Sequence, residues 1–210
     1  MAEVLAMKIS EAAQLPAAFA QAHFPQRYEA AQRFCFEADR MRSMAAGTLL
    51  WYRFGDCESR LRKGEWGKPY LAQSDCHFNL SHSGEYAVLA VGDTALGVDI
   101  EKCTEKNLNV ARRVFTAPEQ AWMREDALPR FEALWTLKES VMKAVGKGMQ
   151  LEPNTFEVLP LLEGEAIEID GVKLYGFTNR YADYAVSLCA QKPIISLSIK
   201  EITAEDILKK

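Results

Sequence analysis

The chain has 210 residues, of which 49% are hydrophobic, so it can bury a substantial core in one domain or in two small ones. Its formal net charge of −4 argues against a general nucleic-acid-binding protein, and no window approaches the roughly 18 apolar residues of a membrane span. The five cysteines are scattered without a C-x-x-C pair, and no basic segment leads into an apolar run at the start. We therefore expect a soluble, cytoplasmic protein with reduced thiols that binds neither nucleic acid nor a membrane.

The first part of the chain predicts one strand followed by helices. Val4 to Ile9 is a candidate strand, and the alanine-rich stretch from Leu15 to Ala22 is predicted to be helical. Pro25 suits the first turn of a further helix, which we expect to run to about Gly47. Its expected buried face is Tyr28, Ala31, Phe34 or Cys35, and Ala38. The arginines of this region form, in the simplest interpretation, a solvated basic face: Arg27, Arg33, Arg40 and Arg42.

Hydroxyl groups and an imidazole are concentrated from His77 to Gly84, just before the apolar run from Tyr86 to Val91. Ser-His-Ser suggests a hydrolase, but neighbours on an extended chain point apart and a G-x-S-x-G elbow is missing. Hydroxyls and imidazoles are also phosphate ligands. We expect a turn here, with either a structural or a phosphate-binding role. The loop from Gly92 to Thr94 is the predicted boundary between two halves, residues 1–93 and 94–210.

The stretch from Leu96 to Glu101 alternates with period two, which predicts a strand. Its apolar members share one face, whereas Gly97, Asp99 and Glu101 share the other. Two carboxylates at positions i and i+2 lie roughly 7 Å apart, near enough to reach one cation. Such an oxygen-only pair suits Mg²⁺. An edge strand with a solvated acidic face is the alternative interpretation.

The stretch from Trp135 to Gly148 separates apolar from charged residues at helical spacing. The apolar stripe comprises Leu134, Leu137, Val141 and Val145. Trp135, Glu139 and Lys143 lie on roughly the opposite side, and Gly146 is typical of a helix end. Glu139 and Lys143 could equally form a solvated i,i+4 ion pair.

Two further patterns complete the expected elements. Thr116 as N-cap with Glu119 predicts a capping box, and Phe115-Thr116 resembles Phe24-Pro25, which indicates a weak internal repeat. Four alternating runs in the last third predict an antiparallel meander. These runs are Thr155 to Leu161, Ala166 to Ile169, Val172 to Thr178, and Ala182 to Cys189.

Four motifs occur in a fixed order along the chain. They are N-L-S-H-S (Asn79 to Ser83), G-V-D-I-E (Gly97 to Glu101), F-T-x-x-E (Phe115, Thr116 and Glu119) and W-T-x-K-E-S-x-x-K-A-x-G-K-G (Trp135 to Gly148). Together they resemble the 4′-phosphopantetheinyl transferases of the larger monomeric type, which activate peptide and polyketide synthetases. The resemblance implies an α+β fold with two similar halves about a pseudo-two-fold axis. Each half would be a small antiparallel sheet packed with helices, and the cofactor would lie in the cleft between them.

The activity implied by this resemblance is transfer of the 4′-phosphopantetheine arm of coenzyme A to a conserved serine of an acyl or peptidyl carrier protein. The reaction releases 3′,5′-ADP and depends on Mg²⁺, with Mn²⁺ as an alternative. The carrier protein would belong to fatty acid, polyketide or nonribosomal peptide biosynthesis.

Residue roles also follow from the resemblance. Asp99, Glu101 and Glu139 would hold the metal, and Glu139 would take the proton of the carrier serine directly or through a metal-bound water. Lys143 would offset charge on the departing 3′,5′-ADP, and His82 would bind phosphate, with Lys138 helping. The implied contacts to coenzyme A are Arg27, Arg42, Ser43, Lys68, Ser81, His82, Asp99, Glu139 and Lys143.

One position departs from the family pattern, because Ala30 stands where a second basic residue often accompanies Arg27 at the 3′-phosphate. Three other functions are alternatives: a Mg²⁺-dependent phosphohydrolase acting on coenzyme A or nucleotides, a non-catalytic coenzyme A binder, and a structural interaction module. Because the chain is slightly acidic, docking of an acidic carrier protein requires a local basic or apolar surface. The candidates for it are Arg112, Arg113, Met123, Arg124, Lys147 and Met149.

Overall fold

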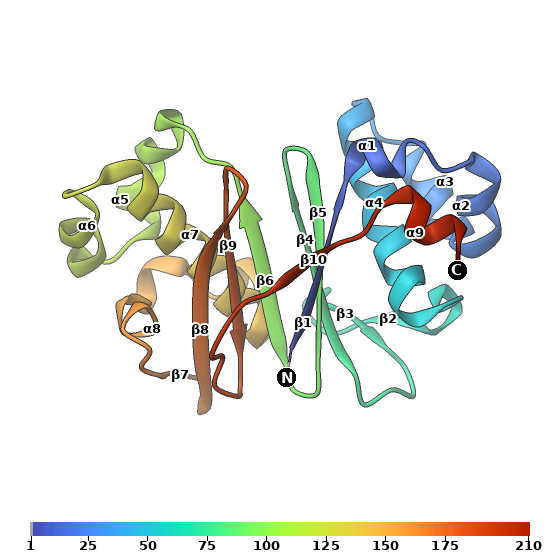
Figure 1. The fold of residues 1–210 in the computed structure, drawn as a ribbon. Coiled ribbons are helices and arrows are strands. Elements are labelled where there is room, and N and C mark those ends of the chain that lie inside the picture. Colours follow the sequence, from blue (N-terminus) through green and yellow to red (C-terminus); the bar gives the residue numbers. More distant parts are fainter. Residues whose placement is uncertain (1) are drawn as a thin grey trace.

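The computed structural model describes residues 2–210, which form two sheets packed face to face with helices on both outer sides (Figure 1). The first sheet has the strand order β10-β1-β5-β4 and the second has the order β6-β9-β8-β7. The strands of the first sheet are Glu3–Lys8 (β1), His77–Ser83 (β4), Tyr86–Gly92 (β5) and Ile199–Glu201 (β10). Those of the second are Leu96–Glu101 (β6), Ile167–Ile169 (β7), Val172–Tyr181 (β8) and Tyr184–Ala190 (β9). Leu61–Lys63 (β2) and Pro69–Leu71 (β3) form a separate hairpin.

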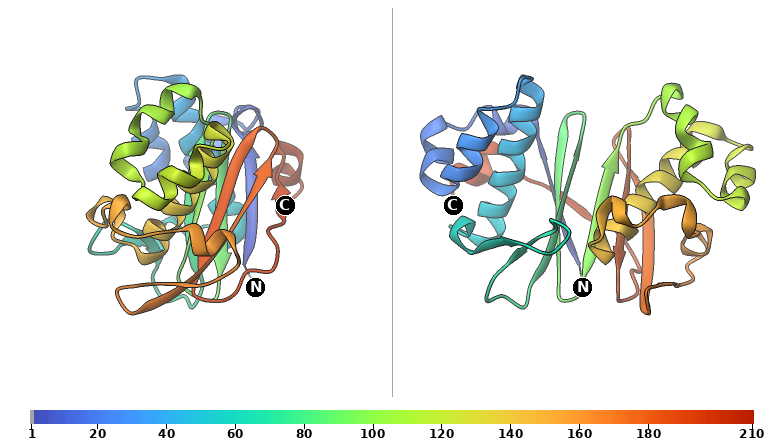
Figure 2. Two further views of the ribbon diagram at one scale, coloured as in Figure 1. Left: turned by 90° about the vertical axis from the view of Figure 1, so that its left-hand side faces the viewer. Right: turned by 180° about the vertical axis from the view of Figure 1, so that it is seen from behind.

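Helices cover the outer face of each sheet, as the two further views in Figure 2 also show. Beside the first sheet lie Ile9–Ala12 (α1), Ala17–His23 (α2), Pro25–Ala31 (α3), Glu37–Phe54 (α4) and Ala204–Leu208 (α9). Beside the second lie Ala111–Val114 (α5), Ala117–Met123 (α6), Ala127–Val145 (α7) and Leu159–Leu162 (α8). Short 3-10 turns occupy Glu58–Arg60 (η1), Glu105–Val110 (η2), Gly148–Gln150 (η3) and Pro153–Thr155 (η4). The predicted α+β fold, with helices packed on small sheets, is confirmed.

The centre of the molecule is an apolar layer between the two sheets. Alternate residues of β1 and β5, such as Val4 and Val88, meet Val98 and Ile100 of β6 and Val186 of β9. All of these are buried. The period-two pattern of residues 96–101 therefore has the predicted consequence: its apolar face enters the inter-sheet core, and the face with Asp99 points toward α7.

Strand β6 and helix α7 approach each other closely at Gly97. A Cβ atom added there would lie 2.1 Å from the carbonyl oxygen of Ser140 and 2.5 Å from the backbone nitrogen of Ala144. Only glycine fits this contact, because both neighbours are backbone atoms that cannot move aside. The close packing sets the distance between the strand that carries Asp99 and the helix that carries Glu139 and Lys143.

The end of the chain returns to the first sheet. Strand β10 pairs in parallel with β1, and Ile202 and Ile207 join the core of the first half. Figure 1 shows this tail, in red, crossing from the second sheet to the first. The predicted division into 1–93 and 94–210 falls between β5 and β6, but it assigns to the second half a tail that packs on the first.

The prediction of one continuous helix from Pro25 to Gly47 is wrong, because two helices occupy this region. Helix α3 ends at Ala31 and α4 begins at Glu37, and Phe34, Cys35 and Ala38 are exposed rather than buried. Tight backbone hydrogen bonds, including that from Phe34 N to Ala31 O, close the last turn of α3. The break allows α3 to fold back against α4, so that each helix buries its own apolar face.

Two other segments differ from the prediction. The expected turn at His77 to Gly84 is strand β4, and the turn to β5 comes only at Gly84 and Glu85. The expected strand from Thr155 to Leu161 contains the end of η4 and the start of α8 instead, where Pro160 suits a first helical turn. The capping box of Thr116 and Glu119 is confirmed, as are strands close to the other three predicted runs.

Two global features of residues 2–210 bear on the expectations from composition. None of their helices combines the length and apolar character needed to cross a membrane. All five cysteines are free thiols, as predicted.

Replacing Gly97 with alanine tests the contact between β6 and α7. We expect Gly97→Ala to lower the free energy of unfolding by about 2 kcal/mol or more, because the added methyl group overpacks a backbone contact. Gly64→Ala is the control, since its nearest neighbour to an added Cβ is Lys68 O at 3.6 Å, an ordinary contact. Urea unfolding of both variants would measure the difference, and equal stability would contradict the proposed close packing.

Candidate active site

The edge strands of the two sheets, β4 and β6, are joined by side chains. Asn79 Oδ1 accepts a hydrogen bond from Val98 N at 2.9 Å, and Ser81 Oγ donates to Asp99 Oδ1 at 2.7 Å. One step further along, Ser83 Oγ donates to Glu101 Oε2 at 2.8 Å. We call these three contacts the β4–β6 ladder. Side-chain contacts, rather than a continuous backbone ladder, therefore join these two edge strands, one from each half of the chain.

Helix α7 adds a cation to the middle of the ladder. Lys143 Nζ lies 2.5 Å from Asp99 Oδ1 and 3.0 Å from Ser81 Oγ. The Asp99 side chain is only 3% exposed, whereas that of Lys143 is 25% exposed. The ion pair of Lys143 is therefore with Asp99 on the neighbouring strand, in a partly desolvated place, rather than the solvated pair with Glu139 that helical spacing also allowed.

Three carboxyl groups in this region have raised pKa values. Burial raises the pKa of Asp99, although the ammonium group of Lys143 opposes the shift. Burial, and then the negative charge of Asp99, raises the pKa of Glu101 to about 7. The same two causes raise the pKa of Glu139. Desolvated carboxylates that repel one another stabilise a cation placed among them.

Asp99 has a further property that bears on a metal ion. Its Oδ2 atom is buried and has no hydrogen-bond partner within residues 2–210. A buried acceptor without a partner is costly, and a hard cation would satisfy it. Within residues 2–210, this region included, no three His, Cys, Asp or Glu side chains lie close enough together to hold a metal ion. The donor atoms nevertheless fit Mg²⁺ chemically, because all three side chains offer carboxylate oxygens.

The carboxylates line a cavity of about 540 Å³ between the two halves. It collects most of the predicted site residues: Arg27, Ser43, Ser81, His82, Asp99, Glu101, Glu139 and Lys143. Phe34, Asp39 and Trp135 also line it, and none of these three was predicted as a site residue. No local pattern predicts the exposure of Phe34, because the helix break that exposes it depends on packing.

The basic and hydroxyl side of the cavity comes from α3, α4 and β4. Glu58 fixes the start of α3 by accepting hydrogen bonds from Gln26 N and Arg27 N at 2.9 and 2.8 Å. Burial lowers the pKa of the Arg27 guanidinium, yet an arginine stays charged at neutral pH. Desolvation, and then the charge of Arg42, lower the pKa of His82, which favours the neutral ring.

Two predicted coenzyme A contacts lie outside this cavity. Arg42 pairs with Asp39 at 2.6 Å and donates to Gly84 O at 2.8 Å, which places it beside the cavity wall. Lys68 donates to Leu96 O at 2.9 Å and to Ala144 O at 3.2 Å, and it lines a separate cavity of about 340 Å³. Burial lowers the pKa of Lys68 to about 8.

The expectation that Lys138 helps to bind phosphate is wrong. Its side chain is fully buried on the apolar side of α7, where Nζ lies 2.9 Å from Glu119. It also donates to Pro153 O at 2.7 Å and to Phe156 O at 2.6 Å. Glu119 is equally buried and in turn accepts hydrogen bonds from Thr116 N and Val158 N. Lys138 is therefore a structural cation.

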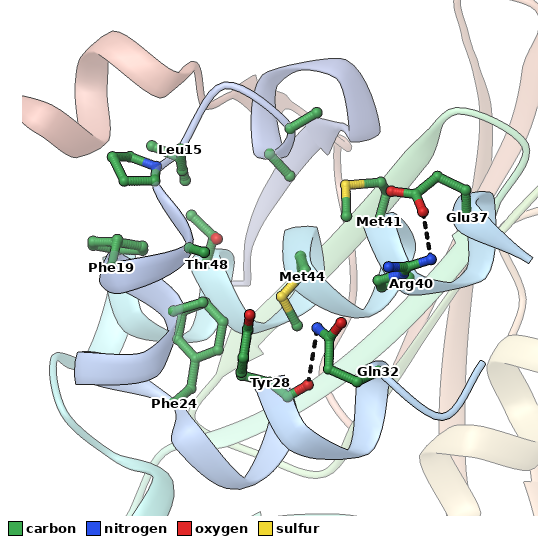
Figure 3. A pocket seen from close by; sticks show the side chains of 15 residues that line it. Leu15, Phe19, Phe24, Tyr28, Gln32, Glu37, Arg40, Met41, Met44 and Thr48 are labelled. Carbon is green, nitrogen blue, oxygen red and sulfur yellow. Dashed lines mark hydrogen bonds and ion pairs between the residues drawn. The ribbon is translucent and has the colours of Figure 1, made fainter. Parts of the chain in front are cut away.

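Another cavity, of about 270 Å³, lies among the helices α1 to α4 (Figure 3). Figure 3 shows aromatic and methionine side chains around it, and Arg40 at its edge paired with Glu37. No residue predicted to bind coenzyme A or metal lines this cavity. The candidate site is thus confined to the cleft between the halves and the neighbouring space beside Lys68.

Comparisons with known proteins agree with this arrangement. The family profile of the 4′-phosphopantetheinyl transferase superfamily matches residues 95–189. A 4′-phosphopantetheinyl transferase of Bacillus subtilis is 35% identical over 153 residues, covering 69% of this chain and 68% of the relative. The transferase Sfp of Bacillus subtilis (strain 168) is 28% identical over 199 residues, covering 88% and 89%. The transferase gsp of Aneurinibacillus migulanus is 41% identical over 99 residues, covering 45% of this chain and 41% of the relative.

The chain therefore belongs to the 4′-phosphopantetheinyl transferase superfamily. It is an enzyme that transfers phosphopantetheine from coenzyme A to carrier proteins. This membership supports the transferase over the phosphohydrolase, the passive coenzyme A binder and the structural module.

The structural role of Lys138 can be tested by stability. We expect Lys138→Met to lower the free energy of unfolding by about 3–5 kcal/mol, because it leaves the buried Glu119 carboxylate without its cation. The control is Lys147→Met, which removes a half-exposed ion pair with Asp170 at 2.7 Å and should cost about 1 kcal/mol or less. Denaturant unfolding of both proteins measures the contrast, and a neutral Lys138→Met would refute the assignment.

Proposed function

We propose that coenzyme A binds across the cavity between the two halves, with its phosphates beside Arg27, Ser81 and His82. The observation that supports this most is the single cavity that carries cationic and hydroxyl groups on one side and carboxylates on the other. Lys143 joins the two sides through its contacts to Ser81 and Asp99. Because one chain supplies both sides, we also propose that the enzyme acts as a monomer.

Asp99, Glu101 and Glu139 would hold Mg²⁺ in this proposal. Support comes from the unpartnered Oδ2 of Asp99 and from the pKa values of Glu101 and Glu139, which are raised by burial and then by the negative charge of Asp99. When bound, the ion neutralises charge on the pyrophosphate oxygens. Mn²⁺ has similar ligand preferences and is an alternative.

The serine oxygen of the carrier protein forms a bond to the phosphorus on the pantetheine side of the pyrophosphate. The bond from that phosphorus to the bridging oxygen breaks, and 3′,5′-ADP leaves. Glu139 accepts the serine proton from its place on the wall of the cavity. Lys143 exchanges its contacts with Ser81 and Asp99 for the leaving phosphate, where its charge offsets the developing negative charge.

Two contacts outside the cavity retain supporting roles in the proposal. Arg42 donates a hydrogen bond to Gly84 O in the turn between β4 and β5. Its positive charge also lowers the pKa of His82. Lys68 and Ser43 would complete the nucleotide end. To reach the nucleotide, the ammonium group of Lys68 would have to leave its hydrogen bond to Leu96 O and extend out of the separate cavity that it lines. The acceptor is a serine of an acyl or peptidyl carrier protein.

The role of Glu139 can be tested by removing its basicity while keeping its shape. We expect Glu139→Gln to retain the wild-type melting temperature but to lose about 10²–10⁴-fold in turnover, the range typical of a general base. Mass spectrometry of an apo carrier protein incubated with enzyme, coenzyme A and Mg²⁺ measures the transfer. Glu125→Gln, in an exposed pair with Arg130, should leave turnover unchanged. Near-normal turnover of Glu139→Gln would refute the role.

A further inference from the structure

The connection between α3 and α4 exposes two phenylalanines. Phe34 is 47% exposed and Phe36 is 71% exposed. Within residues 2–210, neither belongs to the three apolar clusters that form the cores. Two large exposed aromatic side chains so close together are a feature that folding does not explain, and such surfaces commonly bind a partner.

This surface is continuous with the candidate active site. Phe34 lines the same cavity as Glu139 and Trp135, and the exposed Phe36 follows two residues later in the chain. Figure 1 shows the start of α4 and the C-terminal end of β6 at the same end of the molecule. A serine that reaches Glu139 from a folded protein must bring that protein's surface against the edge of the cavity.

The charge beside the two phenylalanines is positive. Glu37 and Asp39 are each paired within α4, with Arg40 and Arg42 respectively, at 2.6 Å in both cases. Arg33 is exposed, and within residues 2–210 it has no ion pair. A partner with an apolar patch flanked by carboxylates would complement this segment.

We propose that Phe34 and Phe36 form the docking surface for the carrier protein, receiving apolar side chains next to its acceptor serine, while Arg33 faces its carboxylates. This inference rests on the proposed function. It differs from the candidates suggested by the sequence, such as Arg112 in α5 and Met149 in η3, because the connection from α3 to α4 reaches the cavity through Phe34. Phe36 is the side chain to test, since it lies outside the cavity and can act on the carrier without touching coenzyme A.

The experiment is steady-state transfer to a purified apo-peptidyl carrier domain and a purified apo-acyl carrier protein, with each substrate varied in turn. We expect Phe36→Ala to raise KM for the carrier about tenfold or more, in the range of an interface anchor. Turnover at saturating carrier, KM for coenzyme A and melting temperature should stay within about twofold of wild type. Phe36→Leu should recover most of the loss, because it restores apolar area.

Ile195→Ala provides a matched control, because Ile195 is 91% exposed and lines a different cavity. It should leave KM for both substrates unchanged. Arg33→Glu should raise KM for the carrier and lessen its dependence on salt. Unchanged KM for the carrier in Phe36→Ala, or an equal rise for coenzyme A, would overturn the docking surface. If wild-type enzyme modified neither carrier, the proposed function itself would fail, and the two failures are therefore distinguishable.

Discussion

The buried ion pair between Asp99 and Lys143 is the interaction on which the rest of the structure depends. Asp99 comes from β6, Lys143 from α7, and Ser81, which contacts both, from β4 of the other sheet. The pair therefore joins both halves of the chain at one point. It can form because Gly97 allows α7 to approach β6 more closely than any other residue would. The close approach of β6 and α7 at Gly97 therefore sets the positions of the Asp99, Glu101 and Glu139 carboxylates.

Such a cluster is a poor way to gain stability. Apolar side chains of similar volume commonly stabilise a protein as well as a buried ion pair does, since desolvation opposes the attraction. Here the protein also leaves Asp99 Oδ2 without a partner and keeps Glu101 and Glu139 near a like charge. The other buried pair, Lys138 with Glu119, is fully hydrogen-bonded. The contrast between the two pairs supports a functional role for the first and a structural role for the second.

Local patterns predicted the elements that carry the site, and long-range packing decided the rest. Period-two alternation identified both faces of β6, and helical spacing separated Glu139 and Lys143 from the apolar stripe of α7. The burial of Lys138 could not be predicted in this way, because its partners Pro153 O and Phe156 O lie beyond the helix. The strand β10 in the C-terminal tail could not be predicted either, because it is a strand only through its pairing with β1. The β4–β6 ladder did have a signal: Asn79, Ser81 and Ser83 alternate along the chain.

The most direct test of a metal centre in this cleft is a crystal structure of the enzyme with coenzyme A and Mn²⁺, examined by anomalous scattering at the manganese edge. We expect one strong peak within coordination distance of the Asp99, Glu101 and Glu139 carboxylates and of the pyrophosphate, with Lys143 moved from Asp99 toward phosphate. A peak elsewhere, or a pyrophosphate bound outside the cavity between the two halves, would contradict that centre.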